Sequence, residues 1–208
     1  MASPQSNLEC AKRGGAGDVM TRSESRSFDL LRLTERSATL LAICLALCAS
    51  VSAGSGDKAR NRAARALRQG EYKVAEKLYR ELVDKDERDV DARLGLSYAL
   101  LKERKLQDAF DEAARAIAYD PSSARAHALV GTALLASGDF RLSVEEFRRA
   151  LGLNEDEALA IAGLAMVDFY DNRLNESLNG LRRAVRLDAS EPDYIFNLGQ
   201  AAARTEHY

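Results

Sequence analysis

Few side chains in this sequence have the type and spacing that acid–base or nucleophilic chemistry needs. Of the 2 histidines, His127 stands inside an apolar helical pattern, where a packed histidine is far commoner than a catalytic one, and His207 is next to last. No serine or cysteine stands in a nucleophile motif. The glycine-rich stretch 14–17 lacks the Lys-Ser/Thr of a phosphate-binding loop. The sequence predicts no enzyme, no cofactor and no metal site.

Asp168 is a carboxylate in an unexpected place. It interrupts the apolar stretch that runs from Ile161 to Tyr170. A carboxylate on an apolar helix face must either pair or reach water. We therefore expect a structural ion pair between Asp168 and Arg182 or Arg183.

The elements that would position such residues recur along the chain. A window of 34 residues aligns without insertion or deletion over 56–89, 90–123, 124–157, 158–191 and, in part, 192–208. Its eighth position holds Ala63, Ser97, Gly131, Ala165 and Gly199, and its twentieth holds Ala75, Ala109, Ser143 and Ser177. Apolar residues follow two helical faces in each window. The fifteenth position, which holds Gly70, Gly138 and Asn172, is typical of a turn between them.

These patterns predict an all-α fold of stacked helical hairpins, each with two helices of about 13 residues. The small residues let the two helices of a hairpin approach closely. We expect Phe140 and Phe147 to fill the space between neighbouring hairpins.

A period of 34 with small residues at positions 8 and 20 resembles the tetratricopeptide repeat (TPR) family. The resemblance covers Gly56–Tyr208 and includes Pro121 at position 32, whereas the family's Trp at position 4 is missing. It implies a right-handed superhelical solenoid that binds a protein or peptide. The partial fifth window stops before its second helix. We therefore expect either a truncated chain or self-association through this uncapped end.

The resemblance also implies that the first helix of each hairpin lines a concave groove through positions 2, 5, 9, 12 and 13. The predicted protein-binding residues are Arg60, Arg68, Tyr98, Lys102, Arg125, Thr132, Met166, Phe169, Tyr170, Phe196 and Gln200. The groove thus changes from charged near its start to apolar and aromatic near its end. The apolar end predicts a grip on an apolar peptide or an amphipathic helix; the alternative is packing against a continuation of the solenoid.

The first part of the chain looks like a targeting segment. Residues 1–36 are polar and carry no apolar period, which predicts a disordered leader. Ser37–Gly56 has no charged residue, and its apolar centre is short for a bilayer span of about 20 residues. Segment 37–53 therefore fits a signal-peptide core with cleavage after Ala53; the alternative is an uncleaved membrane anchor. Either Met1 or Met20 is the true start.

Cysteine usage and charge agree with export. Cys10, Cys44 and Cys48 all precede the cleavage site, and a thiol-free domain suits an oxidising compartment. With 30 basic and 32 acidic residues the net charge is −2, which argues against a nucleic-acid ligand. We expect a periplasmic or secreted protein, or one anchored in the inner membrane with its repeats outside, that touches the membrane only through its N-terminal segment.

The sequence leads to two expectations about function. The first is an exported scaffold that mediates protein–protein interaction through its concave groove. The alternative is an N-terminal arm of a larger secreted or periplasmic enzyme, for example an aspartyl protease-like hydrolase, whose catalytic domain is missing from this chain. A membrane-anchored assembly factor is a third interpretation, which an uncleaved segment 37–53 would favour.

Overall fold

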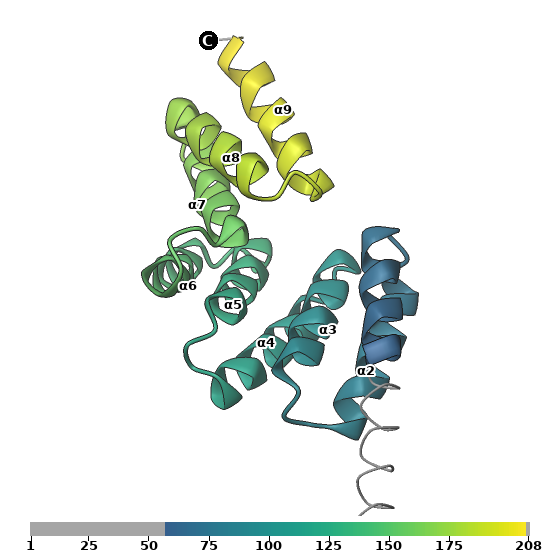
Figure 1. Cartoon of the computed structure of the whole chain (residues 1–208). Coiled ribbons are helices and arrows are strands. Elements are labelled where there is room, and N and C mark those ends of the chain that lie inside the picture. Colours follow the sequence, from purple (N-terminus) through teal and green to yellow (C-terminus); the bar gives the residue numbers. More distant parts are fainter. Residues whose placement is uncertain (1–56, 207–208) are drawn as a thin grey trace, which may run out of the picture. The chain divides into compact units, whose positions relative to one another are not determined.

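The computed structural model describes residues 57–206, and every regular element within them is a helix. A first helix over 57–68 is followed by α2 (Tyr72–Lys85), α3 (Val90–Lys102), α4 (Leu106–Tyr119), α5 (Ala124–Ser137), α6 (Phe140–Leu153), α7 (Ala158–Tyr170), α8 (Leu174–Leu187) and α9 (Pro192–Glu206) (Figure 1). The leader 1–36 and the signal-peptide or anchor segment 37–53 lie outside the described residues and stay predictions. Among the helices described, none has the length and apolarity that crossing a bilayer requires.

Each hairpin turns through one residue in the left-handed conformation. The φ angles are 75° at Gly70, 63° at Arg104, 93° at Gly138 and 63° at Asn172. The amide of the next residue closes a Schellman-type bond to the end of the first helix, as in Glu71 N–H donating to the Ala66 carbonyl at 2.9 Å. Glycine and asparagine adopt this conformation at low cost. The three turns predicted at such residues are confirmed, and the fourth turn is at Arg104.

The small residues at positions 8 and 20 are the points where the helices of a hairpin meet. Ser97 in α3 and Ala109 in α4 are both fully buried. The Ser97 hydroxyl donates to the Ala109 carbonyl at 2.8 Å, so one polar contact is satisfied inside the interface. Gly131 and Ser143 are likewise buried in the next hairpin. The predicted close approach of the paired helices is confirmed.

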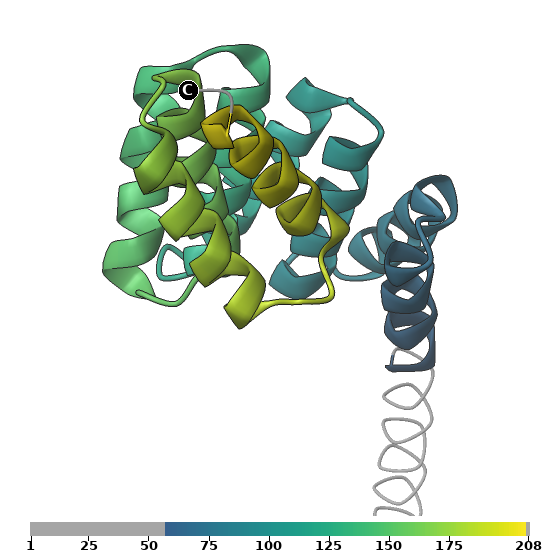
Figure 2. The same ribbon diagram turned by 90° about the horizontal axis from the view of Figure 1, so that it is seen from above.

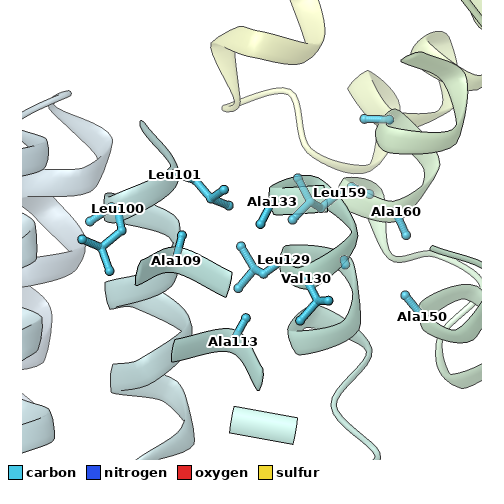
Figure 3. Packing of buried hydrophobic residues seen from close by; sticks show 14 of the residues in the cluster. Leu100, Leu101, Ala109, Ala113, Leu129, Val130, Ala133, Ala150, Leu159 and Ala160 are labelled. Carbon is cyan, nitrogen blue, oxygen red and sulfur yellow. The ribbon is translucent and has the colours of Figure 1, made fainter. Parts of the chain in front are cut away.

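Aromatic side chains at position 24 fill the space between successive hairpins. Phe147 is fully buried, and a Cβ added to Gly163 of the next hairpin would lie 2.2 Å from its ring. Tyr79 lies over Gly95 in the same way. Small and branched apolar side chains of neighbouring helices belong to the same core, among them Leu100, Leu129 and Ala150 (Figure 3). The predicted role of Phe147 is therefore confirmed.

Two expectations about individual side chains need correction. Phe140 is 42% exposed and lies at the edge of the interface, where its ring meets Tyr170 edge-on at 5.5 Å. Asp168 is paired, as expected, but its partner is Arg173, whose Nη2 is 2.5 Å from Oδ1. The turn after α7 folds Arg173 back onto the last turn of that helix, which makes it the nearest cation.

Successive hairpins stack so that their first helices lie along one side. Helices α3, α5, α7 and α9 contact one another in this order, whereas α4, α6 and α8 each contact the helices before and after them (Figure 2). The chain therefore forms a TPR-like helical solenoid with one layer of first helices. That layer carries the predicted groove.

Candidate protein-binding groove

Two cavities open on the layer of first helices, and their walls use the positions expected for a groove. The first has a volume of about 490 Å³ and the second of about 250 Å³. The residues of both that stand at positions 2, 5, 9, 12 or 13 are Ala64, Leu67, Arg68, Asp91, Leu94, Tyr98, Arg125, Thr132, Leu135, Ala136, Leu159, Ala162, Met166, Tyr170 and Asp193. The repeat register thus directs the first helices' groove positions toward the same hollow surface.

The first cavity is polar and rich in tyrosine. Arg68 and Arg125 contribute guanidinium groups, and Tyr72, Tyr79 and Tyr98 contribute rings. Its far wall is the turn between α8 and α9, which the sequence places several windows away. The arginines and rings suit carboxylates and flat apolar surface, and the turn contributes two carboxylates of its own, from Asp188 and Glu191.

The second cavity is mostly apolar. Leu135, Leu159, Met166 and Tyr170 line it, and the Thr132 hydroxyl is already used, because it donates to the Ala128 carbonyl at 2.8 Å. Tyr170 is 56% exposed. A concave apolar surface in water with an adaptable methionine is typical of a peptide-binding site.

Four side chains join α3 to the start of α9 between these cavities, and we call them the clasp: Tyr98, Lys102, Glu191 and Asp193. Lys102 Nζ donates to Glu191 Oε1 at 2.7 Å and to Asp193 Oδ2 at 2.6 Å. The Tyr98 hydroxyl also donates to the Glu191 carboxylate. Tyr98 and Glu191 line the first cavity and Asp193 lines the second, so the clasp lies on their boundary.

The protonation states of the clasp donors are held by this geometry. Burial raises the pKa of Tyr98, and the hydrogen bond to Glu191 raises it further. Burial opposes the charge of Lys102, but its bonds to Asp193 and Glu191 outweigh that effect and raise the pKa of Lys102. Both donors therefore carry their protons at neutral pH.

Arg125 supports the clasp from α5. Its Cζ lies 5.6 Å from the centre of the Tyr98 ring, and Lys102 Nζ lies 5.0 Å from it. Arg125 Nη1 donates to Glu157 Oε1 at 2.9 Å. Next to it, burial raises the pKa of Tyr194 to about 12. Two cations thus lie near the ring of Tyr98, whose hydroxyl donates to the Glu191 carboxylate.

The remaining predicted residues lie outside both cavity walls. Arg60 pairs with Asp89 at 2.5 Å. Phe169 is partly buried beneath Arg204, whose Cζ lies 4.9 Å from the ring centre. Phe196 is 65% exposed and Gln200 is exposed, both on α9. A binding role stays a prediction for these four residues and for those that line the cavities or form the clasp.

Sequence reasoning missed Glu191 as a site residue and did not single out Asp193. Both belong to the turn that opens the partial fifth window, and the period alone indicated only a helix start there. The acid–proline–acid run was a visible signal. Its partners stand about ninety residues earlier, at a separation that a 34-residue pattern does not predict. Within the described residues no group of three or more metal-binding side chains gathers.

Comparisons with known proteins agree with this fold. A tetratricopeptide repeat model matches residues 60–124 and 104–158. None of the curated proteins matches the sequence. Among solved structures, a thermophilic TPR protein of Thermus thermophilus has a TM-score of 0.64 at 15% identity, with 72% of this chain and 82% of that chain covered.

Two further solved structures are similar at lower scores. The Pseudomonas aeruginosa protein pilF has a TM-score of 0.53 at 18% identity, covering 74% of this chain and 72% of that one. MamA from Desulfovibrio magneticus RS-1 has a TM-score of 0.50 at 22% identity, covering 73% and 85%. At such identities the likeness extends to the fold alone. The matching repeat model identifies residues 60–158 as tetratricopeptide repeats, and the other described hairpin elements have the same helical fold.

Proposed function

We propose that this protein is a scaffold that binds a partner protein or peptide through the groove formed by its first helices. The observation that carries the proposal is the apolar second cavity, lined by Leu135, Met166 and Tyr170 on a surface open to water. Apolar side chains around an open hollow are exposed to water, which is unfavourable. A bound apolar side chain would displace that water and lower the free energy.

The fold supports the same function. The solenoid core is complete beneath the groove, because Phe147, Leu129 and Leu181 are fully buried there. Small residues recur at core positions 8 and 20 of every complete window, whereas groove positions 9 and 13 differ between windows. In repeat proteins, such a division leaves the concave surface to ligands.

Site-specific photo-crosslinking in the host cell tests this function. A photoreactive residue replaces Tyr170 in the groove, and the control position is Leu153 on α6, which is 47% exposed. We expect a protein adduct from position 170 that Met166→Lys suppresses. Leu153→Lys should leave it unchanged. Equal adducts from positions 170 and 153 would contradict groove binding.

We also propose that the repeats act outside the cytoplasm. The uncharged segment 37–53, which ends in Val-Ser-Ala, supports this location. The intact mass of the chain isolated from host envelopes tests it. A chain that begins at Gly54 supports export with cleavage. A full-length chain whose repeats resist protease added outside the inner membrane contradicts it.

A further inference from the structure

We propose that the groove face of α3 is a docking site for a partner segment with two carboxylates two residues apart, and that the chain's own Glu191 and Asp193 occupy this site in cis. The inference rests on the proposed function, since it names the chemistry of the groove's ligand. Tyr98 and Lys102, at groove positions 9 and 13 of the second window, are the donors.

The contact between the two regions is made by side chains alone. Helices α3 and α9 share no close backbone contact within the described residues. Tyr98 and Lys102 stand one turn apart on α3 and reach the two acids that flank Pro192. Opening of the clasp therefore separates side-chain tips without breaking a close backbone contact between α3 and α9.

The donors form a site for anions even apart from the acids that occupy it. Lys102 Nζ lies 6.0 Å from the ring centre of Tyr72 as well as near Tyr98, so both rings favour its ammonium form there. Arg125, which also pairs with Glu157, places a second cation 5.6 Å from the ring centre of Tyr98. Charge-assisted hydrogen bonds of the kind that Lys102 makes are about twice as strong as neutral ones.

The spacing of the acids defines the ligand. One carboxylate must accept from both the Tyr98 hydroxyl and Lys102, and a second, two residues later, must accept from Lys102 alone. The residue between them needs no contact, and here it is Pro192. An acid–any–acid segment satisfies all three bonds.

The direction of the cis segment predicts which residues a partner carries after its acids. Asp188, Ser190 and Glu191 line the first cavity, whereas Tyr194 and Asn197 line the second. The segment therefore runs from the polar cavity toward the apolar one. A partner that binds in the same direction would place apolar residues after its acid pair, against the apolar wall of the second cavity.

The cis acids compete with any such partner. A segment tethered within the same chain acts at an effective concentration of the order of millimolar. A partner present at lower concentration must bind more tightly than the clasp to replace it. Removal of the cis carboxylates should therefore raise partner affinity about tenfold or more.

The test uses the full chain and a fluorescent synthetic peptide that copies residues 187–198. A matched peptide, called the amide peptide, replaces the copies of Glu191 and Asp193 with Gln and Asn and keeps the copy of Asp188. We expect the variant with Glu191→Gln and Asp193→Asn to bind the acidic peptide at least about tenfold more tightly than the native chain does. The amide peptide should bind the variant and the native chain with equal affinity. Adding Lys102→Met to the variant should abolish its higher affinity for the acidic peptide.

Equal affinity of the native chain and the variant for the acidic peptide would overturn the inference, as would equal binding of the acidic and amide peptides. Asp193→Asn alone is a second variant, because the Asp193 side chain is 63% exposed and its loss leaves the fold intact. The Asp193→Asn variant should also bind the acidic peptide more tightly than the native chain does, but by a smaller factor. If the peptide test fails while crosslinking at position 170 persists, the acidic ligand is rejected and partner binding in the groove remains supported.

Discussion

The two cavities of the groove are built on the same repeat positions and yet differ in chemistry. Position 13 is Lys102 beside the first cavity and Tyr170 in the second, and position 9 is Tyr98 in the first and Met166 in the second. The core beneath them keeps small residues at positions 8 and 20 of every complete window. The fold therefore depends on one set of positions and ligand chemistry on another, and the two can be altered separately.

The largest expected effect comes from breaking the core under the second cavity. Phe147→Ala should lower the free energy of unfolding by about 3–5 kcal/mol, because it leaves a hole between Gly131 and Gly163. Chemical denaturation monitored by circular dichroism measures it. Phe140→Ala is the matched control: its ring is 42% exposed, and we expect a loss of about 1 kcal/mol from its pairing with Tyr170. Similar losses for the two variants would contradict the assigned core.

Removal of the clasp donor Lys102 should lower stability less than loss of Phe147, but more than removal of another cation of the first cavity. Lys102→Met should cost about 2 kcal/mol of unfolding free energy, because Glu191, with a side chain only 15% exposed, loses a charged donor. Arg68→Met should change stability by less than about 0.5 kcal/mol, since Arg68 is exposed. If urea denaturation gave equal midpoints for both variants, Lys102 would not hold the clasp.

Alkaline pH should weaken the clasp without touching the apolar cavity. The pKa values of Tyr98 and Lys102 are both raised in the folded chain, so their contribution is complete below about pH 10 and is lost as the pH rises further. Thermal melts between about pH 8 and 11 measure this decline. The variant with Tyr98→Phe and Lys102→Met should decline less steeply than the native chain; an identical slope would contradict the assignment.

The smallest expected effect concerns the turn before α4. Arg104 has a φ of 63°, a conformation that glycine adopts without strain. Arg104→Gly should therefore raise the unfolding free energy by about 0.5–1 kcal/mol, as measured by thermal melts. Gly138→Ala, at the equivalent turn with φ 93°, should lower it by a similar amount. A loss of stability in the Arg104 variant would show that its side chain contributes more than the turn costs.

Most of the fold could be predicted because each hairpin is specified locally. Gly70, Gly138 and Asn172 marked turns by their residue type, and the small residues at positions 8 and 20 marked the close helix contacts. The turn at Arg104 was not predicted from its residue type, because arginine has no preference for the left-handed conformation. The predicted partner of Asp168 was wrong, since the turn brings Arg173 nearer than any cation on α8.

The site could be predicted only in part. Groove positions can be read from the repeat register, and Tyr98, Arg125, Met166 and Tyr170 line the cavities as expected. The clasp depends on how far the solenoid curves over several hairpins, and small angles at each interface decide that. No spacing within a single window encodes it, so Glu191 could be paired with Tyr98 only from the structure.

Methyl NMR of Met166 tests the central claim most directly. The chain has 3 methionines, of which Met166 alone lies in the described residues, so selective methyl labelling reports on the second cavity with few signals. The Met166→Leu variant assigns its signal. The bound segment of the cross-linked partner, added as a peptide, should shift this signal in a saturable way, and Tyr170→Ala should weaken the response. Saturable binding that leaves the Met166 methyl signal unmoved would contradict a groove-bound partner.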